Sequence, residues 1–88
     1  MIYGVDKPDI AHVRQHNREA HLAYLQAFQD AIHMAGPLLD AAGSPCGSLL
    51  LMDFPDRAAA ERFAAADPYA KAGLFERVEI APWKKVLP

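Results

Sequence analysis

The sequence predicts an α+β fold in which one antiparallel sheet carries two helices on a single face. A long amphipathic helix pattern covers Asp9–Asp30, an apolar strand pattern covers Ser48–Phe54, and a shorter helix pattern covers Arg57–Ala66. Shorter strand patterns precede the first helix, follow it, and follow the second helix. The order is therefore strand, helix, strand, strand, helix, strand, which right-handed crossovers arrange as a split βαβ sheet.

Length and composition favour one folded domain, residues 1–88. The chain has 88 residues, of which 52% are hydrophobic, so it can build one core and is not expected to be disordered. Nine basic and eleven acidic residues give no field suited to nucleic acid. No apolar run is long enough to span a bilayer, no signal peptide is visible, and the single cysteine, Cys46, suits a reducing compartment. We expect a cytoplasmic protein that contacts no membrane.

The first strand and the start of the first helix follow from residues 1 to 9. Met1–Val5 is short, apolar and rich in residues that favour strands, so it is expected to pair on both sides. Asp6-Lys7-Pro8-Asp9 ends this strand. Proline suits the approach to a helix, and an aspartate beside it can cap free backbone N–H groups.

The first helix places charged side chains on its apolar stripe. Leu25 and Phe28 share one face with Arg14, Arg18 and His21, while polar residues occupy the opposite face. Buried cations are costly unless something pairs with them. We therefore expect a carboxylate, a ligand or a wet cavity opposite this stripe.

A hairpin is predicted after the first helix. Ile32–Leu38 is expected to form a strand, and Pro37, which has no N–H for a ladder, places that strand at an edge, a bulge or an end. Asp40–Gly47 holds turn-forming residues and connects it to Ser48–Phe54. Both faces of Ser48–Phe54 are largely apolar, so a second copy of the chain is the expected cover for the outer face.

The last third of the chain is predicted to form a helix, a turn and a strand. Asp67 ends the helix over Arg57–Ala66, because the proline that follows disfavours α geometry before it. Tyr69–Gly73 is a turn that can include one helical turn closed by the glycine. Leu74–Pro82 is the last strand, and Trp83–Pro88 is a tail.

His21 and Asp67 are the leading candidates for chemistry, because both helices lie on one side of the sheet. An imidazole titrates near neutrality, and a carboxylate on one ring nitrogen fixes the tautomer so that the other nitrogen can exchange a proton. The alternative is a core histidine satisfied by a backbone carbonyl. Arg14 and Arg18 could hold an anionic substrate or pair with Asp67. For Arg14, an exposed head on a buried stem is the favoured alternative.

Other constellations are weaker. Ser48 near a histidine and an aspartate could suggest a hydrolase triad, but it lacks the strand-to-helix G-x-S-x-G elbow, and a hydrogen-bonding role in the pocket wall is favoured. His12 and His16 have metal-binding spacing with Glu19. They lack the glutamate of H-E-x-x-H and point to solvent, so no metal is expected. Cys46 has no activating neighbour and is expected to be inert.

A set of short motifs extends over nearly the whole chain in a specific order, and the chain resembles the YCII-like (YciI-related) family of small proteins. The resemblance implies a ferredoxin-like α+β fold of the dimeric α+β barrel type, with a homodimer formed through the sheet. It also implies an active site of a histidine and an aspartate, which are His21 and Asp67 here. The motifs are Asp6-Lys7-Pro8-Asp9, Arg14, Arg18, Ala20-His21-Leu22, Ala35-Gly36-Pro37, Gly47-Ser48, Ala66-Asp67-Pro68-Tyr69, Ala72-Gly73 and Lys84-Lys85-Val86.

The resemblance places Ser48, Arg14, Arg18 and Tyr69 beside the pair as candidate substrate-binding residues. One characterised relative is a dehydrochlorinase of a chlorinated hydroxyhydroquinone, which makes proton abstraction with loss of a leaving group the model reaction. This chain departs from the family in a shorter first strand, in Glu19 where proline is common, and in a helix end without glycine.

The main hypothesis is a small, cofactor-free, dimeric enzyme that performs acid–base chemistry on an aromatic or anionic metabolite. His21 is the expected base, Asp67 its orienting partner, and Arg18 or Ser48 the group that holds the developing anion. Two alternatives remain: a non-catalytic module that binds a metabolite or serves a larger assembly, and a cofactor-independent oxygenase.

Overall fold

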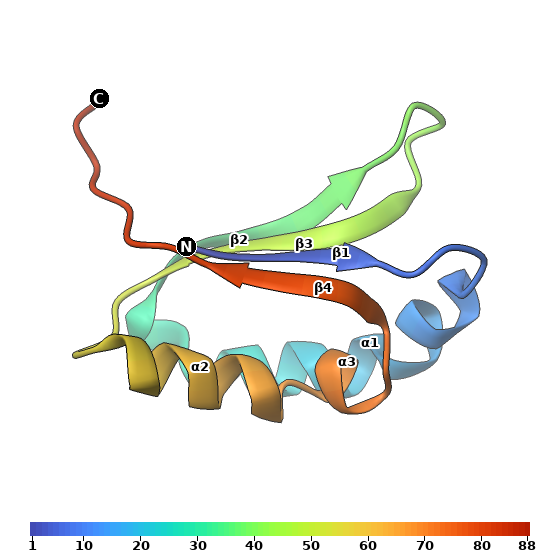
Figure 1. Ribbon diagram of the computed structural model, residues 1–88, viewed down its shortest axis with the longest axis horizontal. Helices are drawn as coiled ribbons and strands as arrows, with labels where there is room; N and C mark the ends of the chain where they lie inside the picture. The colour runs from blue at the N-terminus through green and yellow to red at the C-terminus, as the bar shows by residue number, and fades with distance from the viewer.

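A computed structural model describes residues 1–88, and it confirms the α+β architecture with an antiparallel sheet. The strand order is β2-β3-β1-β4, and all helices lie below the sheet in Figure 1. The central strand β1 pairs with both β3 and β4, and β2, which contains Pro37, lies at an edge as predicted. The elements are β1 (Ile2–Asp6), α1 (Ala11–Gln26), a 3₁₀ turn (Gln29–Ala31), β2 (Ile32–Leu39), β3 (Pro45–Met52), α2 (Arg57–Ala66), α3 (Pro68–Lys71) and β4 (Phe75–Ile80).

The first helix is shorter at both ends than the periodicity predicts. Asp9 has a positive φ of 61° and lies outside the helix, and the N-cap position is Ile10, which makes no side-chain cap. The prediction that an aspartate beside Pro8 caps this helix is therefore wrong. At the other end α1 stops at Gln26, and a 3₁₀ turn leads directly into β2.

The hairpin between β2 and β3 is tighter than predicted. The Asp40 side chain accepts hydrogen bonds from the backbone N–H groups of Ala42 and Ser44, at 2.9 and 3.0 Å. Gly43 has a φ of 85°, which a glycine adopts at little cost. Because the turn closes by Ser44, β3 starts at Pro45 and ends at Met52, instead of covering Ser48–Phe54.

The junction between α2 and α3 behaves as the sequence predicts. Asp67 has φ −59° and ψ 130°, an extended conformation that ends α2 before Pro68. The Asp67 side chain then caps α3 by accepting from the backbone N–H of Tyr69 at 2.9 Å. The single helical turn that follows ends before Gly73, whose φ is 75°.

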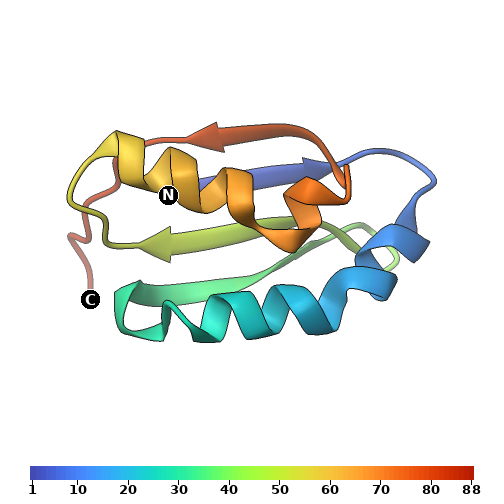
Figure 2. The same ribbon diagram turned by 90° about the horizontal axis from the view of Figure 1, so that it is seen from below.

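The space between sheet and helices has an apolar half and a polar half. The apolar half centres on Ile2, Leu25, Leu50 and Phe63, and the rings of Tyr24 and Phe28 pack against Phe63 on α2. The polar half uses α1 from Arg14 to His21, the junction before α3 and the C-terminal end of β1. Figure 2 shows α1 running along the sheet beside α2 and α3, so one helix lines both halves.

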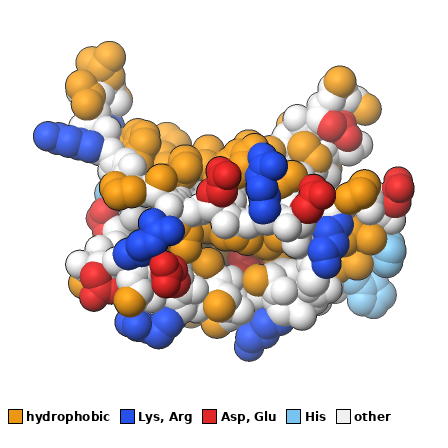
Figure 3. Space-filling model, in the orientation of Figure 1, with side chains coloured by type: hydrophobic (Ala, Val, Ile, Leu, Met, Phe, Trp, Pro, Cys, Tyr) orange, Lys and Arg blue, Asp and Glu red, His pale blue; other side chains and the backbone are white.

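The outer face of the sheet is open and largely apolar. Strand alternation places Tyr3, Leu49 and Leu51 on this face, since Ile2, Ser48 and Leu50 are buried on the opposite side. Met34 on β2 is 67% exposed. Figure 3 shows hydrophobic side chains gathered over the sheet, between the β2–β3 hairpin and the C-terminal tail. None of the helices has the length and apolar character needed to cross a bilayer.

Candidate active site

His21 and Asp67 meet in the polar half of the interior. Nδ1 of His21 lies 2.8 Å from Oδ1 of Asp67, and both side chains are buried, with 8% and 7% of their surface exposed. An ionised carboxylate can only accept, so Nδ1–H donates and the lone pair of the neutral ring stays on Nε2. The same Asp67 oxygen accepts from the N–H of Tyr69, which fixes the carboxylate in place.

Tyr69 forms an aromatic wall against His21. The two rings stack with centroids 3.9 Å apart and planes 13° from parallel. Burial raises the pKa of Tyr69, and the positive charges of Arg14 and Arg18 offset part of that rise. The phenol therefore stays neutral at physiological pH, and its ring restricts rotation of the imidazole.

Arg14 is buried and fully engaged by the protein. Its Nε and Nη2 donate to the two carboxylate oxygens of Asp6 at 2.7 and 2.8 Å, and Nη2 also donates to Ser48 Oγ at 2.9 Å. Its guanidinium carbon lies 4.8 Å from the Tyr69 ring centroid. Burial alone would lower the pKa of Arg14, but the hydrogen bonds and charge of Asp6 outweigh it and raise the pKa.

The two arginines differ from the sequence predictions in opposite ways. Arg14, for which an exposed head was the favoured alternative, is only 8% exposed and pairs with Asp6, not with Asp67. Arg18, predicted to face inward, is exposed. Arg18 occupies the margin of the helical stripe, from which a long side chain reaches water. The carboxylates expected opposite the stripe are present, as Asp6 and Asp67.

The space beside the pair is small. A cavity of about 10 Å³, room for one water, is lined by Asp67, Ser48 and Phe75 among others. Nε2 of His21 makes no hydrogen bond within the protein, yet no buried polar side-chain atom lacks a partner. Nε2 is therefore not completely enclosed, although only 8% of the His21 side chain is exposed.

The chain is similar to a known protein family and to several of its members. The model of the YCII-related domain matches residues 1–84. The chain belongs to the YCII-related family. Protein YciI of Escherichia coli O6:H1 is 39% identical over 94 aligned positions, covering 98% of this chain and 96% of that protein. An uncharacterized protein of Haemophilus influenzae is 35% identical over the same length and the same coverage.

A solved structure shares both fold and sequence with this YCII-related chain. It is the 5-chloro-2-hydroxyhydroquinone dehydrochlorinase TftG of Burkholderia phenoliruptrix AC1100, in complex with 2,5-dihydroxybenzoquinone. The TM-score is 0.90 and the identity 36%, over 94% of this chain and 90% of the other. The ferredoxin-like fold and the family inferred from the motifs are thereby confirmed.

The metal-ligand candidates and the cysteine lie outside this site, and Ser48 lines the small cavity beside it. His12, His16 and Glu19 are exposed on α1, and no group of three histidine, cysteine or acidic side chains is arranged to hold a metal ion. Cys46 is a free thiol on β3. Ser48 is 4% exposed, and its hydroxyl serves Arg14.

Two features of this YCII-related chain were missed by sequence reasoning. Asp6 was assigned to the end of a strand, whereas its carboxylate holds Arg14 inside the fold. The alternation of Ile2, Gly4 and Asp6 toward the helices was the available signal. A second histidine–aspartate pair, His33 with Asp53, joins the edge strand β2 to the end of β3 at 2.8 Å, with 59% and 78% of the side chains exposed.

Proposed function

We propose that this protein is a small acid–base enzyme of the lyase type, in which His21 removes a proton and Asp67 positions the imidazole of His21. The observation that carries the proposal is the hydrogen bond from His21 Nδ1 to Asp67 Oδ1, with Nε2 left free. The likeness to a dehydrochlorinase over 94% of the chain supports an elimination reaction. The substrate class is a small hydroxylated ring that becomes anionic when deprotonated.

The groups around Nε2 suit such an elimination. In a chlorinated hydroquinone the proton of one hydroxyl moves to the chlorine-bearing carbon, which gives a keto tautomer. Nε2 then takes the proton of the other hydroxyl, the O–H electron pair forms the second carbonyl, a ring double bond shifts onto the carbon that holds chlorine, and chloride departs with the electrons of its C–Cl bond. For a chlorinated hydroquinone the products are an oxidised ring, a proton and chloride, and no external oxidant is needed. Asp67 stabilises the imidazolium that forms.

Arg18 and Tyr69 are the proposed substrate contacts. Arg18 lies three residues before His21 on α1, is exposed, and is close enough to Tyr69 to lower its pKa against the effect of burial. Its guanidinium can therefore meet the developing anion. Arg14 and Ser48 are occupied by each other and by Asp6, so we assign them to the architecture of the site instead.

The test measures chloride release from 5-chloro-2-hydroxyhydroquinone and a panel of related halogenated phenols. His21→Asn is the sharpest variant, because the asparagine amide can replace Nδ1–H as the donor to Asp67 but offers no equivalent of Nε2. The matched control is His33→Asn, which alters the exposed pair. We expect turnover to fall at least about 100-fold in His21→Asn and to be unchanged in His33→Asn. Retained turnover in His21→Asn refutes the mechanism, and oxygen uptake would indicate an oxygenase.

A second function, a non-catalytic binding or assembly module, is favoured by one observation. The cavity beside the His21–Asp67 pair, about 10 Å³, holds no organic ligand without movement of side chains, which counts against chemistry at His21 and leaves a role for another surface of the protein. If a panel of phenols and lactones is never turned over, and ligands that bind leave the His21 ring signals unchanged in NMR spectra, the binding module is correct.

We also propose that the protein forms a homodimer through the outer face of its sheet. The apolar face that includes Leu49, Leu51 and Met34 has no cover within the chain. Light scattering should give twice the mass of the chain, and Met34→Lys should give the monomer without loss of secondary structure. The free Cys46 fits the reducing cytoplasm as the compartment.

A further inference from the structure

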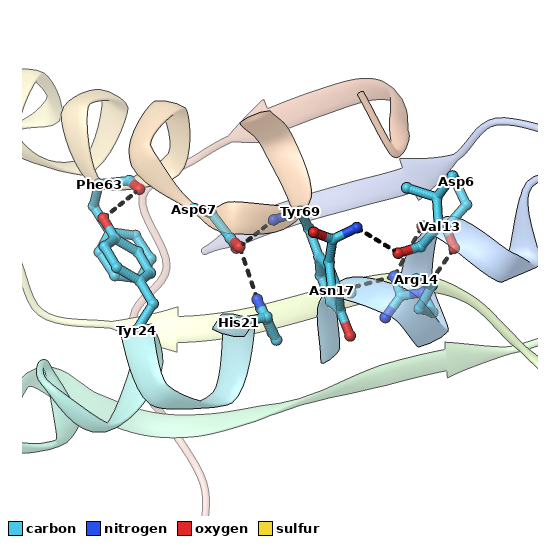
Figure 4. A network of polar contacts seen from close by, with 10 residues as sticks. Asp6, Val13, Arg14, Asn17, His21, Tyr24, Phe63, Asp67 and Tyr69 are labelled. Atoms are coloured by element: carbon cyan, nitrogen blue, oxygen red, sulfur yellow. Dashed lines mark hydrogen bonds and ion pairs between the residues drawn. The ribbon is translucent and has the colours of Figure 1, made fainter. Parts of the chain in front are cut away.

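A buried ion pair lies beside the His21–Asp67 pair without contacting it. Asp6, at the end of β1, engages Arg14 through two hydrogen bonds, and their side chains are 9% and 10% exposed. Arg14 lies against the Tyr69 ring, and the same ring stacks on His21. Figure 4 shows Tyr69 between Arg14 and the His21–Asp67 pair.

We propose that Asp6 and Arg14 are positioning residues for His21: anchored by Asp6, Arg14 holds Tyr69 against the imidazole, and Asp6 cancels the Arg14 charge that would otherwise act on the imidazole. The proposal rests on the proposed function only in naming His21 as the reacting group. Asp6 belongs to the site by this reasoning, although it contacts neither His21 nor Asp67.

The energetics of burial support a role beyond stability. The hydration free energy that two charges lose on burial offsets much of what their attraction contributes. A well-packed apolar pair of similar size often gives the protein the same stability. Here the charge is also placed next to a titratable ring. Since Tyr69 contacts Arg14 and His21 alike, the intervening medium is an aromatic ring instead of water, and screening of the charge is weak.

The test changes the charge of the pair, and Arg14→Gln also removes the contacts of Arg14 with Tyr69 and Ser48. The titratable and charged groups around the imidazole are Asp67 and Tyr69 on the α3 side, Arg18 and Tyr24 on α1, and the Asp6–Arg14 pair. With Asp6 ionised, Arg14 is neutralised and the pair acts on His21 only weakly.

The experiment titrates the four histidines by NMR in the intact protein, which needs no substrate. Asp6→Asn leaves the Arg14 charge uncompensated and should move the His21 titration midpoint to lower pH. Arg14→Gln leaves the Asp6 charge and should move it to higher pH. Each displacement is expected to be about one pH unit. This is the effect of a unit charge that lies one aromatic ring away from the imidazole, with an effective dielectric of about 20. The double variant should return near the wild-type midpoint.

The opposite signs separate this role from a structural one. Loosened packing would displace both single variants in the same direction and would not be reversed in the double variant, and that result, or an unchanged midpoint in Asp6→Asn, overturns the proposal. His33, in the same spectra, is the internal control and should not move. Arg57→Gln, which breaks an exposed ion pair with Glu61, is the matched charge control.

The NMR titration can still overturn the proposal if one variant does not fold, and its outcome does not depend on turnover. Asn keeps the shape of Asp6 and one acceptor oxygen, so an unchanged or raised midpoint in Asp6→Asn overturns the proposal even if Arg14→Gln does not fold. Opposite displacements without any turnover would support the positioning role and reject the enzyme. Turnover with an unchanged midpoint in Asp6→Asn would do the reverse.

Discussion

The chain contains two histidine–aspartate pairs with the same 2.8 Å separation and very different surroundings. His21 and Asp67 are 46 residues apart and nearly enclosed, whereas His33 and Asp53 are 20 residues apart and mostly exposed. Asp67 also caps α3, and His21 also stacks on Tyr69. The second pair makes no other side-chain hydrogen bond, because it lies on the edge strand at a β-bulge.

The comparison shows that a short hydrogen bond does not define a site. Water competes for both partners of the exposed pair, and their side chains lose entropy to meet. Inside the fold, the same contact has a fixed carboxylate on one side and a ring wall on the other, so the imidazole keeps one orientation. Preorganisation of this kind is what general-base chemistry requires.

The largest expected difference between the pairs is in turnover after an aspartate-to-asparagine change. In Asp67→Asn the amide oxygen can still accept from Nδ1–H and from the Tyr69 N–H, but the negative charge that stabilises the imidazolium is lost. Loss of this charge should lower kcat/KM by about 10²–10⁴-fold. Asp53→Asn should leave kcat/KM unchanged.

Nitrogen NMR of the His21 ring supplies the independent readout for this prediction. The spectrum should show the proton on Nδ1 in the wild type and in Asp67→Asn, so that a loss of turnover reports the lost charge and not a change of tautomer. Full turnover in Asp67→Asn would show that the two pairs do not differ in function.

The second difference is in stability. Asp67→Ala removes the acceptor of a buried histidine and the cap of α3 together, and should lower the free energy of unfolding by about 3 kcal/mol. Asp53→Ala should change it by less than about 0.5 kcal/mol. Urea unfolding measures both, and equal losses would remove burial as the distinguishing property.

The parts of this comparison that the sequence predicts are those set by periodicity and local stereochemistry. The strand and helix order, the edge position of β2 with Pro37, and the extended Asp67 before Pro68 follow directly from residue patterns. The order of the elements alone places His21 and Asp67 on the same side of the sheet. Sequence motifs shared with the YCII-related family single them out.

The remainder depends on tertiary geometry. The periodicity of the helix does not predict whether Arg14 or Arg18 enters the fold. Both residues lie on the same apolar stripe, and both side chains are long enough to reach water from it. The partner of Arg14 depends on the register of β1 against β3, which brings Asp6 and Ser48 within reach of one guanidinium. The exposed pair depends on a bulge at His33 that no pattern indicates.

The aromatic wall over His21 should give a third, smaller difference, visible at alkaline pH. Burial raises the pKa of Tyr69, with Arg14 and Arg18 acting against it. Below the unfolded-state pKa, about 10, both states keep the phenol proton and stability is unaffected. As pH rises above that value only the unfolded chain releases it, so stability falls.

Tyr69→Phe should therefore lose less stability than the wild type between pH 9 and pH 11, measured by urea unfolding at each pH. Burial and the charge of Asp67 raise the pKa of Tyr24 as well, so Tyr24→Phe should remove a second share of the alkaline loss. Tyr3→Phe, outside the site, is the control. An unchanged pH profile in Tyr69→Phe would mean that its hydroxyl meets water as freely as it does in the unfolded chain.

The smallest effect is the coupling within the exposed pair itself. A double-mutant cycle of His33→Ala and Asp53→Ala should give an interaction free energy of about 0.2–1 kcal/mol, and 1 M salt should reduce it because both side chains are in water. The enclosed pair cannot be screened in this way, since salt does not enter the interior. A coupling free energy at His33 and Asp53 that is large and independent of salt would mean that this surface is covered in solution, as a second copy on the sheet would cover it. Both pairs would then be buried, one within the chain and the other against a partner.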